Sequence, residues 1–278
     1  MTLRPNARHF ILDLLLASHG QPLTAREAVA ACELFGIREN NVRVALARLS
    51  AEGLVVAAGR GSYELGPHAR DLAGEVAGWR HVDQRLRPWS GAYVVVHVSV
   101  LGRSDRAALR RRERALAMLG FRELERGLFI RPDNIEQDLN ALRQRLHTLG
   151  LETAATVFLA SHFDAAREQG IHHCWDSAAL NASYADGTRR LREWMQGADQ
   201  LDADVAARQS FLLGGQAIRQ VVFDPLLPEP FVDTALRDEF FTTVRRFDAL
   251  GHAIWQQLYA SLNTTGTAAR DDGRQAMH

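Results

Sequence analysis

The spacing of apolar residues changes twice along this chain of 278 residues, and each change limits what the segment can fold into. Up to about residue 65, helical spacing is followed by two short runs of strand type. Residues 92–100 form a run rich in valine, which is typical of a buried strand. From about Trp175 onward helical spacing dominates again. The sequence therefore predicts an α+β protein with three successive segments.

The first segment, residues 1–68, has the pattern of a winged helix-turn-helix domain. Thr24 followed by Glu27 is a capping-box pattern, which marks the start of its second helix. Gly59-Arg60-Gly61 separates the two expected strands as a turn. The expected helices cover residues 8–18, 25–35 and 39–52, and the expected strands cover residues 54–57 and 62–65.

The second segment, residues 85–165, alternates strands and helices in the order β-α-β-β-α-β. This order predicts a ferredoxin-like domain. Gly120 and Gly150 are expected to end its two helices. The expected elements are a strand at 92–100, a helix at 105–119, a hairpin at 121–130, a helix at 135–149 and a strand at 153–160.

The third segment, residues 172–263, is predicted to be a helical domain for dimerisation or effector binding, interrupted at Asp224-Pro-Leu-Leu-Pro228-Glu-Pro230. The tail, residues 264–278, is small and polar, so we expect it to be disordered.

The formal net charge is zero, but the charges are unevenly distributed. Residues 80–131 carry twelve Arg and five acidic residues, a net charge of +7, and residues 132–278 carry a net charge of −7. Three partners could account for the basic segment: an anionic ligand, a phosphate backbone, or the acidic third of the chain itself.

The third expected helix has two distinct faces. Val42, Ala45, Leu46 and Leu49 share one stripe, which should face the core. The other face combines amide, guanidinium and small apolar groups, which suits base edges and thymine methyls in a major groove. Arg60 at the hairpin tip is placed to reach a phosphate or the minor groove. The predicted DNA contacts are Arg38, Asn40, Asn41, Arg43, Val44, Ala47, Arg48 and Arg60.

Several motifs together resemble the PaaX family of bacterial transcriptional repressors. They are the run 35–49, Gly53-Leu54, Arg60-Gly61-Ser-Tyr63-Glu-Leu65, Trp89-Ser-Gly91, Leu119-Gly120-Phe121, Gly127-Leu-Phe-Ile-Arg131-Pro132, Trp175 and Asp224-Pro225-Leu-Leu-Pro228. The run Glu229-Pro-Phe231-Val-Asp-Thr departs from the Trp-Gly type of sequence expected after Pro228.

The resemblance implies a homodimeric repressor of an aromatic-acid (phenylacetate-type) catabolic operon. It also implies that an aryl-coenzyme A thioester, typically phenylacetyl-CoA, releases the protein from double-stranded DNA. A divergent relative that controls another acyl-CoA pathway fits the motifs almost as well. An acyl-CoA sensor that does not bind DNA is a further alternative, from a different class of protein.

An arginine row on the helix expected at 105–119 is a candidate effector site. Arg103, Arg106, Arg110 and Arg114 follow helical spacing, and guanidinium groups bind phosphates in a bidentate manner. The 3′-phosphate and pyrophosphate of coenzyme A fit such a row, while DNA and structural pairing with acidic residues are the alternatives. Trp175 is a candidate for stacking on an aromatic acyl group.

Other chemistry finds little support in the sequence. His172-His173-Cys174 lacks a second ligand pair at metal-site spacing, and no P-loop or nucleophile elbow occurs. A metal-dependent nuclease using Asp105 is the enzymatic alternative, and we expect no enzyme, metal or cofactor. Two cysteines cannot form a disulfide framework, and no apolar stretch of about 18 residues occurs, so a cytoplasmic protein without a membrane span is expected.

Overall fold

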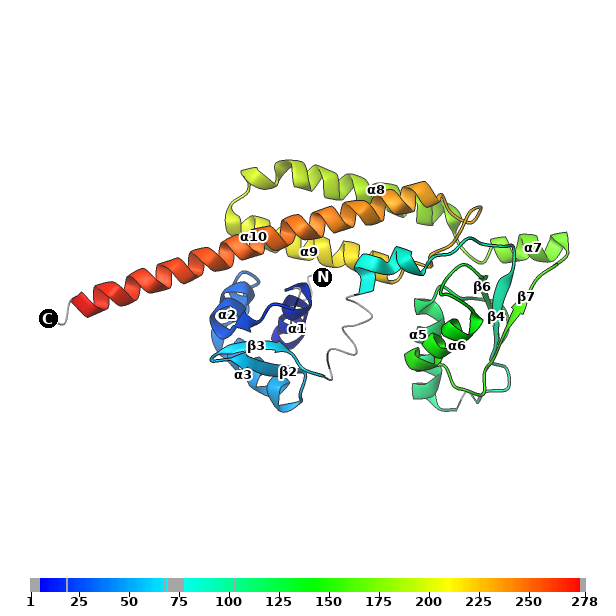
Figure 1. Cartoon of the computed structure of the whole chain (residues 1–278), viewed down its shortest axis with the longest axis horizontal. Coiled ribbons are helices and arrows are strands. Elements are labelled where there is room, and N and C mark those ends of the chain that lie inside the picture. The colour runs from blue at the N-terminus through cyan, green and yellow to red at the C-terminus, as the bar shows by residue number, and fades with distance from the viewer. Residues whose placement is uncertain (1–5, 19, 68, 70–77, 103, 276–278) are drawn as a thin grey trace. The chain divides into compact units, whose positions relative to one another are not determined.

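A computed structural model describes residues 6–18, 20–67, 69, 78–102 and 104–275 (Figure 1). The chain forms two compact units, each with its own core. Unit 1 comprises residues 1–78, 193–216 and 245–278, and unit 2 comprises residues 79–192 and 217–244. Helices and two antiparallel sheets build these units, so the predicted α+β class is confirmed.

Unit 1 begins with three helices and a hairpin close to the expected positions. Thr24 caps the second helix through the predicted reciprocal bonds with Glu27, so the capping box is confirmed. A third, two-residue strand pairs with the hairpin and was not predicted, because it is too short to show an alternating pattern. The elements are α1 (Ala7–Ala17), β1 (Leu23–Thr24), α2 (Ala25–Glu33), α3 (Glu39–Ala51), β2 (Val55–Gly59) and β3 (Ser62–Leu65).

Unit 2 contains a four-stranded antiparallel sheet in the order β5-β6-β4-β7. Strand β4, one of the two central strands, is buried from Tyr93 to Val96, which explains why its sequence is continuously apolar instead of alternating. The elements are β4 (Tyr93–His97), α5 (Arg106–Met118), β5 (Arg122–Glu125), β6 (Leu128–Pro132), α6 (Leu139–Leu149) and β7 (Thr156–Ala160).

Helix α6 starts four residues later than the sequence predicts. Ile135 pairs with Leu86 in an isolated bridge, and Glu136 has φ 61°, which a right-handed helix does not allow. Asp138 then caps the helix by accepting a hydrogen bond from the Ala141 N–H at 2.8 Å. The sequence predicted a start at Ile135 because this residue has the apolar character of a core-facing helical residue, although it belongs to the loop.

Two further helices were not expected, η1 (Gly78–Arg85) and α7 (Ala165–His172). Within α7 the buried residue is Ile171, so the apolar spacing that reveals a helix is missing there. At the other end of the chain, α10 continues as helix to Gln275, which corrects the expected disorder over residues 264–275. A formed helix extends at low cost, because each added residue completes a further backbone hydrogen bond.

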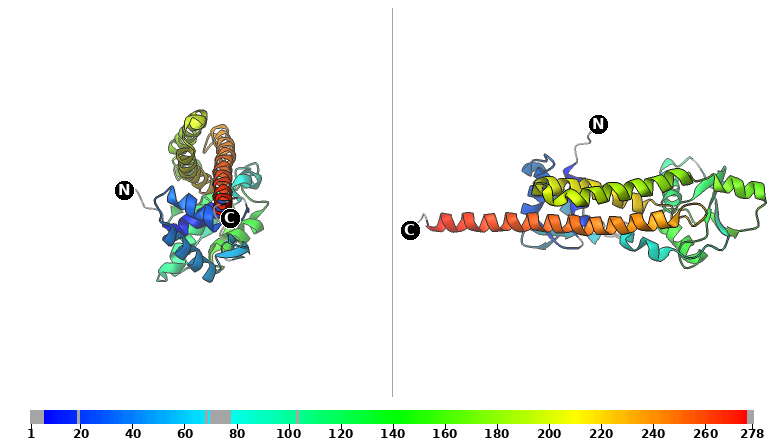
Figure 2. Two further views of the ribbon diagram at one scale, coloured as in Figure 1. Left: turned by 90° about the vertical axis from the view of Figure 1, so that its left-hand side faces the viewer. Right: turned by 90° about the horizontal axis from the view of Figure 1, so that it is seen from above.

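The C-terminal helices α8 (Ser177–Gly197), α9 (Ala203–Val222) and α10 (Thr234–Gln275) lie along one another, with η2 (Ala198–Gln200) between the first two (Figure 2). Gly187 on α8 permits the close approach of α10, because a Cβ there would lie 2.5 Å from the Phe240 ring. The helices contribute to both units, and the separate domain expected over residues 172–263 stays a prediction. Among the described helices, none has the length and apolar character needed to span a membrane.

An ion pair between a buried arginine and a half-buried glutamate fastens α5 to the loop before β7. The Arg112 side chain is 4% exposed and its Nη2 lies 2.5 Å from a carboxylate oxygen of Glu152, while its Nε donates to the other oxygen at 3.0 Å. The hydrogen bond from Arg112 lowers the pKa of Glu152 below its usual value of 4.5. Arg112 is therefore a structural residue within the arginine-rich helix.

We expect Glu152→Gln to lower the free energy of unfolding of unit 2 by about 1–3 kcal/mol at pH 7. Since the folded-state pKa of Glu152 is lowered, the ion pair stabilises the fold above pH 4.5 and loses its effect as the pH falls through the folded-state value. Urea unfolding at pH 7 and pH 3 measures this. A difference between wild type and variant that is the same at both pH values would contradict the assignment.

Candidate nucleic-acid interface

Helix α3 separates its residues into a buried stripe and an exposed face. The stripe predicted to face the core is buried, with Val42 and Leu49 at 0% exposure and Ala45 and Leu46 below 10%. Every residue predicted to touch DNA is exposed, and these are Arg38, Asn40, Asn41, Arg43, Val44, Ala47, Arg48 and Arg60. The exposed face of α3 therefore offers amide, guanidinium and apolar groups together.

Arg43 has a partner on this face that was not predicted from the sequence. Its Nε and Nη2 lie 2.8 Å and 2.6 Å from Oε1 of Glu39, one helical turn earlier. Both side chains are more than half exposed, so the pair contributes at most about 1 kcal/mol and can be exchanged for another acceptor. The i, i+4 spacing of the two residues was the signal that could have revealed it.

The hairpin tip presents Arg60 between two glycines. Gly61 has φ 76°, a conformation that other residues rarely adopt, so the tight turn at this position depends on glycine. The Arg60 side chain is exposed. The tip can therefore bring one guanidinium close to an extended anion without a bulky neighbour in the way.

An aromatic cluster packs the first helices onto α9 and α10 within unit 1. The Phe10 ring lies 4.4 Å from Phe35 and 4.8 Å from Phe211 of α9, and Phe211 lies 6.1 Å from Trp255 of α10 (centroid distances). Tyr259 extends the cluster at 5.6 Å from Trp255. The orientation of α3 is thus tied to residues more than 150 positions away in the sequence, which no local pattern could have indicated.

In unit 2, α5 carries an exposed row of arginines. Arg106, Arg110 and Arg114 are exposed, and none of them forms an ion pair with a residue that the structure describes. Arg110 donates from Nε to the Arg106 carbonyl at 3.2 Å, which leaves its terminal nitrogens toward solvent. Arg103, the fourth member predicted, lies outside the described residues. Structural pairing therefore does not account for the three described arginines.

Trp175 does not lie open for stacking. It is 4% exposed, its indole N–H donates to the Gly120 carbonyl at 3.1 Å, and its ring meets Phe231 edge-on at 5.4 Å. The structure thus places Trp175 in the core of unit 2 rather than on a binding surface. Its large apolar ring is buried there because the one polar atom finds a backbone partner.

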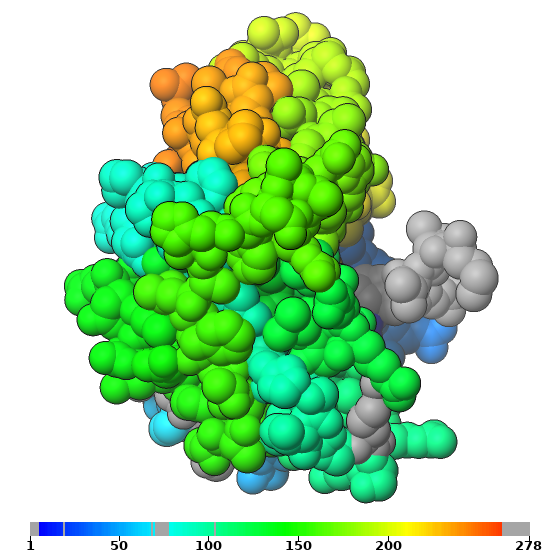
Figure 3. Space-filling view, turned by 90° about the vertical axis from the view of Figure 1, so that its right-hand side faces the viewer, coloured from blue at the N-terminus to red at the C-terminus, as the bar shows by residue number. Residues whose placement is uncertain are grey.

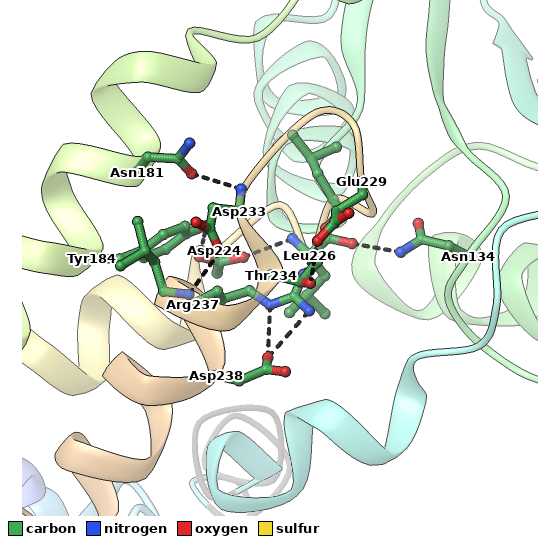
Figure 4. A network of polar contacts seen from close by, with 12 residues as sticks. Asn134, Asn181, Tyr184, Asp224, Leu226, Glu229, Asp233, Thr234, Arg237 and Asp238 are labelled. Carbon is green, nitrogen blue, oxygen red and sulfur yellow. Dashed lines mark hydrogen bonds and ion pairs between the residues drawn. The ribbon is translucent and has the colours of Figure 1, made fainter.

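A buried polar network joins the sheet of unit 2 to the segment between α9 and α10 (Figure 4). Asn134 donates to the Leu226 carbonyl at 2.7 Å, and the Leu226 N–H donates to Asp224 at 2.8 Å. Tyr184 of α8 donates to the other oxygen of Asp224 at 2.7 Å. Arg237 of α10 donates to the Leu227 carbonyl at 2.6 Å. Burial raises the pKa of Asp224, whose charge these donors stabilise.

Arg131 on β6 extends this network into the sheet. It is fully enclosed and donates to the backbone carbonyls of Leu119 and Pro132 and to the side-chain oxygen of Asn134. Burial lowers the pKa of Arg131 to about 9, so the guanidinium remains charged at neutral pH. The motif residues 131–132 and 224–228 therefore meet as parts of one structural junction.

An open groove of about 600 Å³ lies between β5 and α7. Its lining includes Glu123 and Asp164, whose carboxylates disfavour a polyphosphate, together with Arg167, which pairs with Glu125. The groove and the arginine row of α5 have no residue in common. We therefore do not assign the groove to an anionic ligand.

Two family models match this chain. The model described as PaaX-like protein matches residues 6–69, and the model described as PaaX-like protein C-terminal domain matches residues 175–257. The chain belongs to the PaaX-like family of regulators. The first match contains α3 and the hairpin tip, and the second contains all of α8, all of α9 and the first part of α10.

Among solved structures, the PaaX-like chain is similar to an uncharacterized protein, Rv0674, from Mycobacterium tuberculosis. The similarity covers 90% of this chain and 99% of that chain, with a TM-score of 0.60 and 24% sequence identity. It shows that the two proteins share a fold. No curated protein matches the PaaX-like chain.

Proposed function

We propose that this PaaX-like chain is a bacterial, cytoplasmic transcriptional repressor that binds double-stranded operator DNA. Its target is an aromatic-acid catabolic operon of the phenylacetate type, and an aryl-CoA thioester such as phenylacetyl-CoA releases it. The observation that supports DNA binding is the exposed face of α3, where Asn40, Asn41 and Arg43 lie opposite the buried stripe of the same helix. We propose no catalytic step and no cofactor.

The first part of unit 1 is interpreted as a winged helix-turn-helix reading head. In support, α2 and α3 are joined by a turn at Gly36, and the β2–β3 hairpin follows with Arg60 at its tip. Such a head places the N-terminal part of its recognition helix, which here is α3, at base edges in the major groove. Arg43 would leave Glu39 and bind guanine in a bidentate manner, while Arg60 would bind the backbone or minor groove.

The sheet domain of unit 2 is interpreted as ferredoxin-like. In support, its strands follow the β-α-β-β-α-β order and form an antiparallel sheet in which the first and third strands of the domain, β4 and β6, are central. Some enzymes are built on this fold, but here the Asp105 carboxylate caps α5 by accepting from Ala107 and Ala108 at 2.8 Å and 3.0 Å. Within the described part of the chain, no group of three or more His, Cys, Asp or Glu could hold a metal ion.

Residues 1–65 carry a net charge of only +1, so a single reading head should bind DNA weakly. A homodimer doubles the contacts and predicts a two-fold-related operator. The dimer can adopt two conformations, one in which the spacing of its two reading heads matches the operator and one in which it does not. An effector that binds the second conformation more tightly releases the dimer from DNA. A difference of about 1–3 kcal/mol between its two binding free energies is typical of such coupling.

The effector is proposed to bind the exposed arginine row of α5. If it does, Arg106→Ala combined with Arg110→Ala should weaken phenylacetyl-CoA binding roughly 10-fold or more, because two charge-assisted contacts to phosphate are lost. Isothermal titration with phenylacetyl-CoA measures this. Arg126→Ala, which removes an exposed arginine at the β5–β6 turn of the same unit, is the control. Equal affinity in all three proteins would contradict the assignment.

The proposed function is tested by fluorescence anisotropy of the purified chain with the DNA upstream of its own gene and with scrambled DNA. We expect tighter binding to the upstream DNA and release when phenylacetyl-CoA is added. Specific binding that ignores the thioester would remove the proposed effector class. Equal binding to both DNAs at moderate salt would contradict the repressor assignment.

A further inference from the structure

An acidic residue stands among the residues of α3 that are proposed to meet DNA. Glu39 is the first residue of the helix, lies between Arg38 and Asn40 in the sequence, and is exposed. Double-stranded DNA carries one negative charge for about every 1.7 Å of its length, so a carboxylate on a surface that faces it lowers the affinity. Residues 1–65 carry a net charge of only +1, so one such carboxylate is a large part of the balance. The proposed contacts leave Glu39 without a role.

Glu39 is bound to one of the proposed contacts, Arg43. Both Nε and Nη2 of Arg43 donate to Oε1 of Glu39, at 2.8 Å and 2.6 Å. No described residue bonds to the second carboxylate oxygen, Oε2. The Arg43 and Glu39 side chains are 63% and 51% exposed, so the pair lies at the surface. While the pair is closed its net charge is zero, and Arg43 attracts a phosphate only weakly.

The pair also has a structural effect, which is small. A carboxylate in the first turn of a helix interacts favourably with the helix dipole, and a Glu–Arg pair at i, i+4 stabilises an exposed helix slightly. Both effects change the stability of the fold, and neither depends on which DNA is bound. They can therefore be separated from a role in specificity by measuring binding to two different DNAs.

The arginines of α5 show what the pair opposes. Arg106, Arg110 and Arg114 are exposed and form no ion pair with a described residue, so their charges are available to any phosphate. Figure 3 shows unit 2, to which α5 belongs, as a space-filling surface. A reading head that carried Arg43 in this free form would bind the backbone of every DNA equally well. The carboxylate of Glu39 competes with such binding.

We propose that Glu39 determines specificity by keeping Arg43 from phosphates until the correct bases replace both partners of the pair. The inference rests on the proposed function, since it requires that α3 enters the major groove. On DNA of another sequence the pair stays closed, because opening it would leave the carboxylate of Glu39 unpaired beside the phosphates. On the operator Arg43 binds guanine, and Glu39 accepts a hydrogen bond from a cytosine.

Cytosine is the base that suits the released carboxylate. In the major groove only cytosine and adenine present an amino group, and adenine places the N7 acceptor next to it, which repels a carboxylate. Four residues of an α-helix rise about 6 Å, and successive base pairs lie about 3.4 Å apart. The cytosine bound by Glu39 is therefore expected within about two base pairs of the guanine bound by Arg43.

Glu39→Gln tests the restraint on Arg43, because it keeps the size of the side chain and removes the charge. We expect binding to scrambled DNA to become at least about 5-fold tighter and the slope of log K against log salt to steepen by about 0.9 per reading head, since Arg43 is then free to neutralise one phosphate. Fluorescence anisotropy at several salt concentrations measures both. Glu33→Gln removes the same charge from an exposed position of α2 and is the control, which should leave the slope unchanged.

The same substitution in an Arg43→Ala background shows whether Glu39 acts through Arg43. We expect the salt slope to be equal in Arg43→Ala and in the double variant, because no guanidinium is left to release. Equal steepening with and without Arg43 would overturn the inference. So would a Glu39→Gln variant that behaves like Glu33→Gln while the wild type prefers its upstream DNA. A wild type without that preference would contradict the proposed function, and the inference with it.

Upstream DNA fragments in which single base pairs are exchanged test the cytosine. The wild type should lose affinity roughly 5-fold or more at one guanine and at one nearby cytosine of each half-site. Glu39→Ala, which removes the acceptor, should keep the guanine requirement and lose the cytosine requirement. A role confined to helix stability would lower the melting temperature and leave both base requirements as they are. That result would overturn the assignment of Glu39 to cytosine.

Discussion

Replacing Arg131 with methionine is expected to lower the free energy of unfolding of unit 2 by about 3–5 kcal/mol, a larger effect than we expect from any other single substitution. The guanidinium satisfies the carbonyls of Leu119 and Pro132 and the side chain of Asn134 inside the core. Methionine fills much of the volume and offers no donor. Three buried oxygen atoms would lose a partner, and Asn134 would lose the contact that orients it toward Leu226.

Amide hydrogen exchange of β4 and β6 measures this effect, because it reports on unit 2 alone. Arg126→Met is the matched control, since Arg126 is exposed in the same hairpin, and its effect should stay within about 0.5 kcal/mol. If both variants exchanged like the wild type, the guanidinium would not be holding the junction between β6 and the segment 224–228.

Arg43→Ala is expected to weaken operator binding by about 1–3 kcal/mol per reading helix, or roughly 5- to 150-fold, and to relax base preference at one position of each half-site. Binding to scrambled DNA should change little, because a base contact carries the sequence information. Arg60→Ala should instead weaken binding to both DNAs and reduce the salt dependence by about one phosphate contact per head.

Anisotropy titrations with operator and scrambled DNA at several salt concentrations separate the two variants. Arg208→Ala is the control, since Arg208 is an exposed arginine on α9 of the same unit and is not part of the proposed interface. If Arg43→Ala and Arg60→Ala reduced specific and non-specific binding in the same proportion, the roles assigned to the two arginines would be wrong.

Patterns within a few residues determined most elements and the exposed face of α3. The capping box at Thr24 and Glu27 and the stripe of Val42, Ala45, Leu46 and Leu49 are local features, because helix caps and helical periodicity depend on neighbours three to seven positions away. The same locality explains the errors. Ile135 has the right apolar character to begin a helix, and α7 has too few apolar residues to show one.

The sequence by itself also determined which residues of α3 are exposed, because exposure on an amphipathic helix follows from spacing. Only the tertiary structure decided what Trp175, Arg112 and Arg131 do. Each belongs to a type that occurs both at binding surfaces and in cores. The choice depends on partners 40 or more positions away for Arg112 and Trp175, namely Glu152 and Gly120. Burial of a polar group is stable only where distant backbone or side-chain atoms complete its hydrogen bonds, and that requirement is not visible in local sequence.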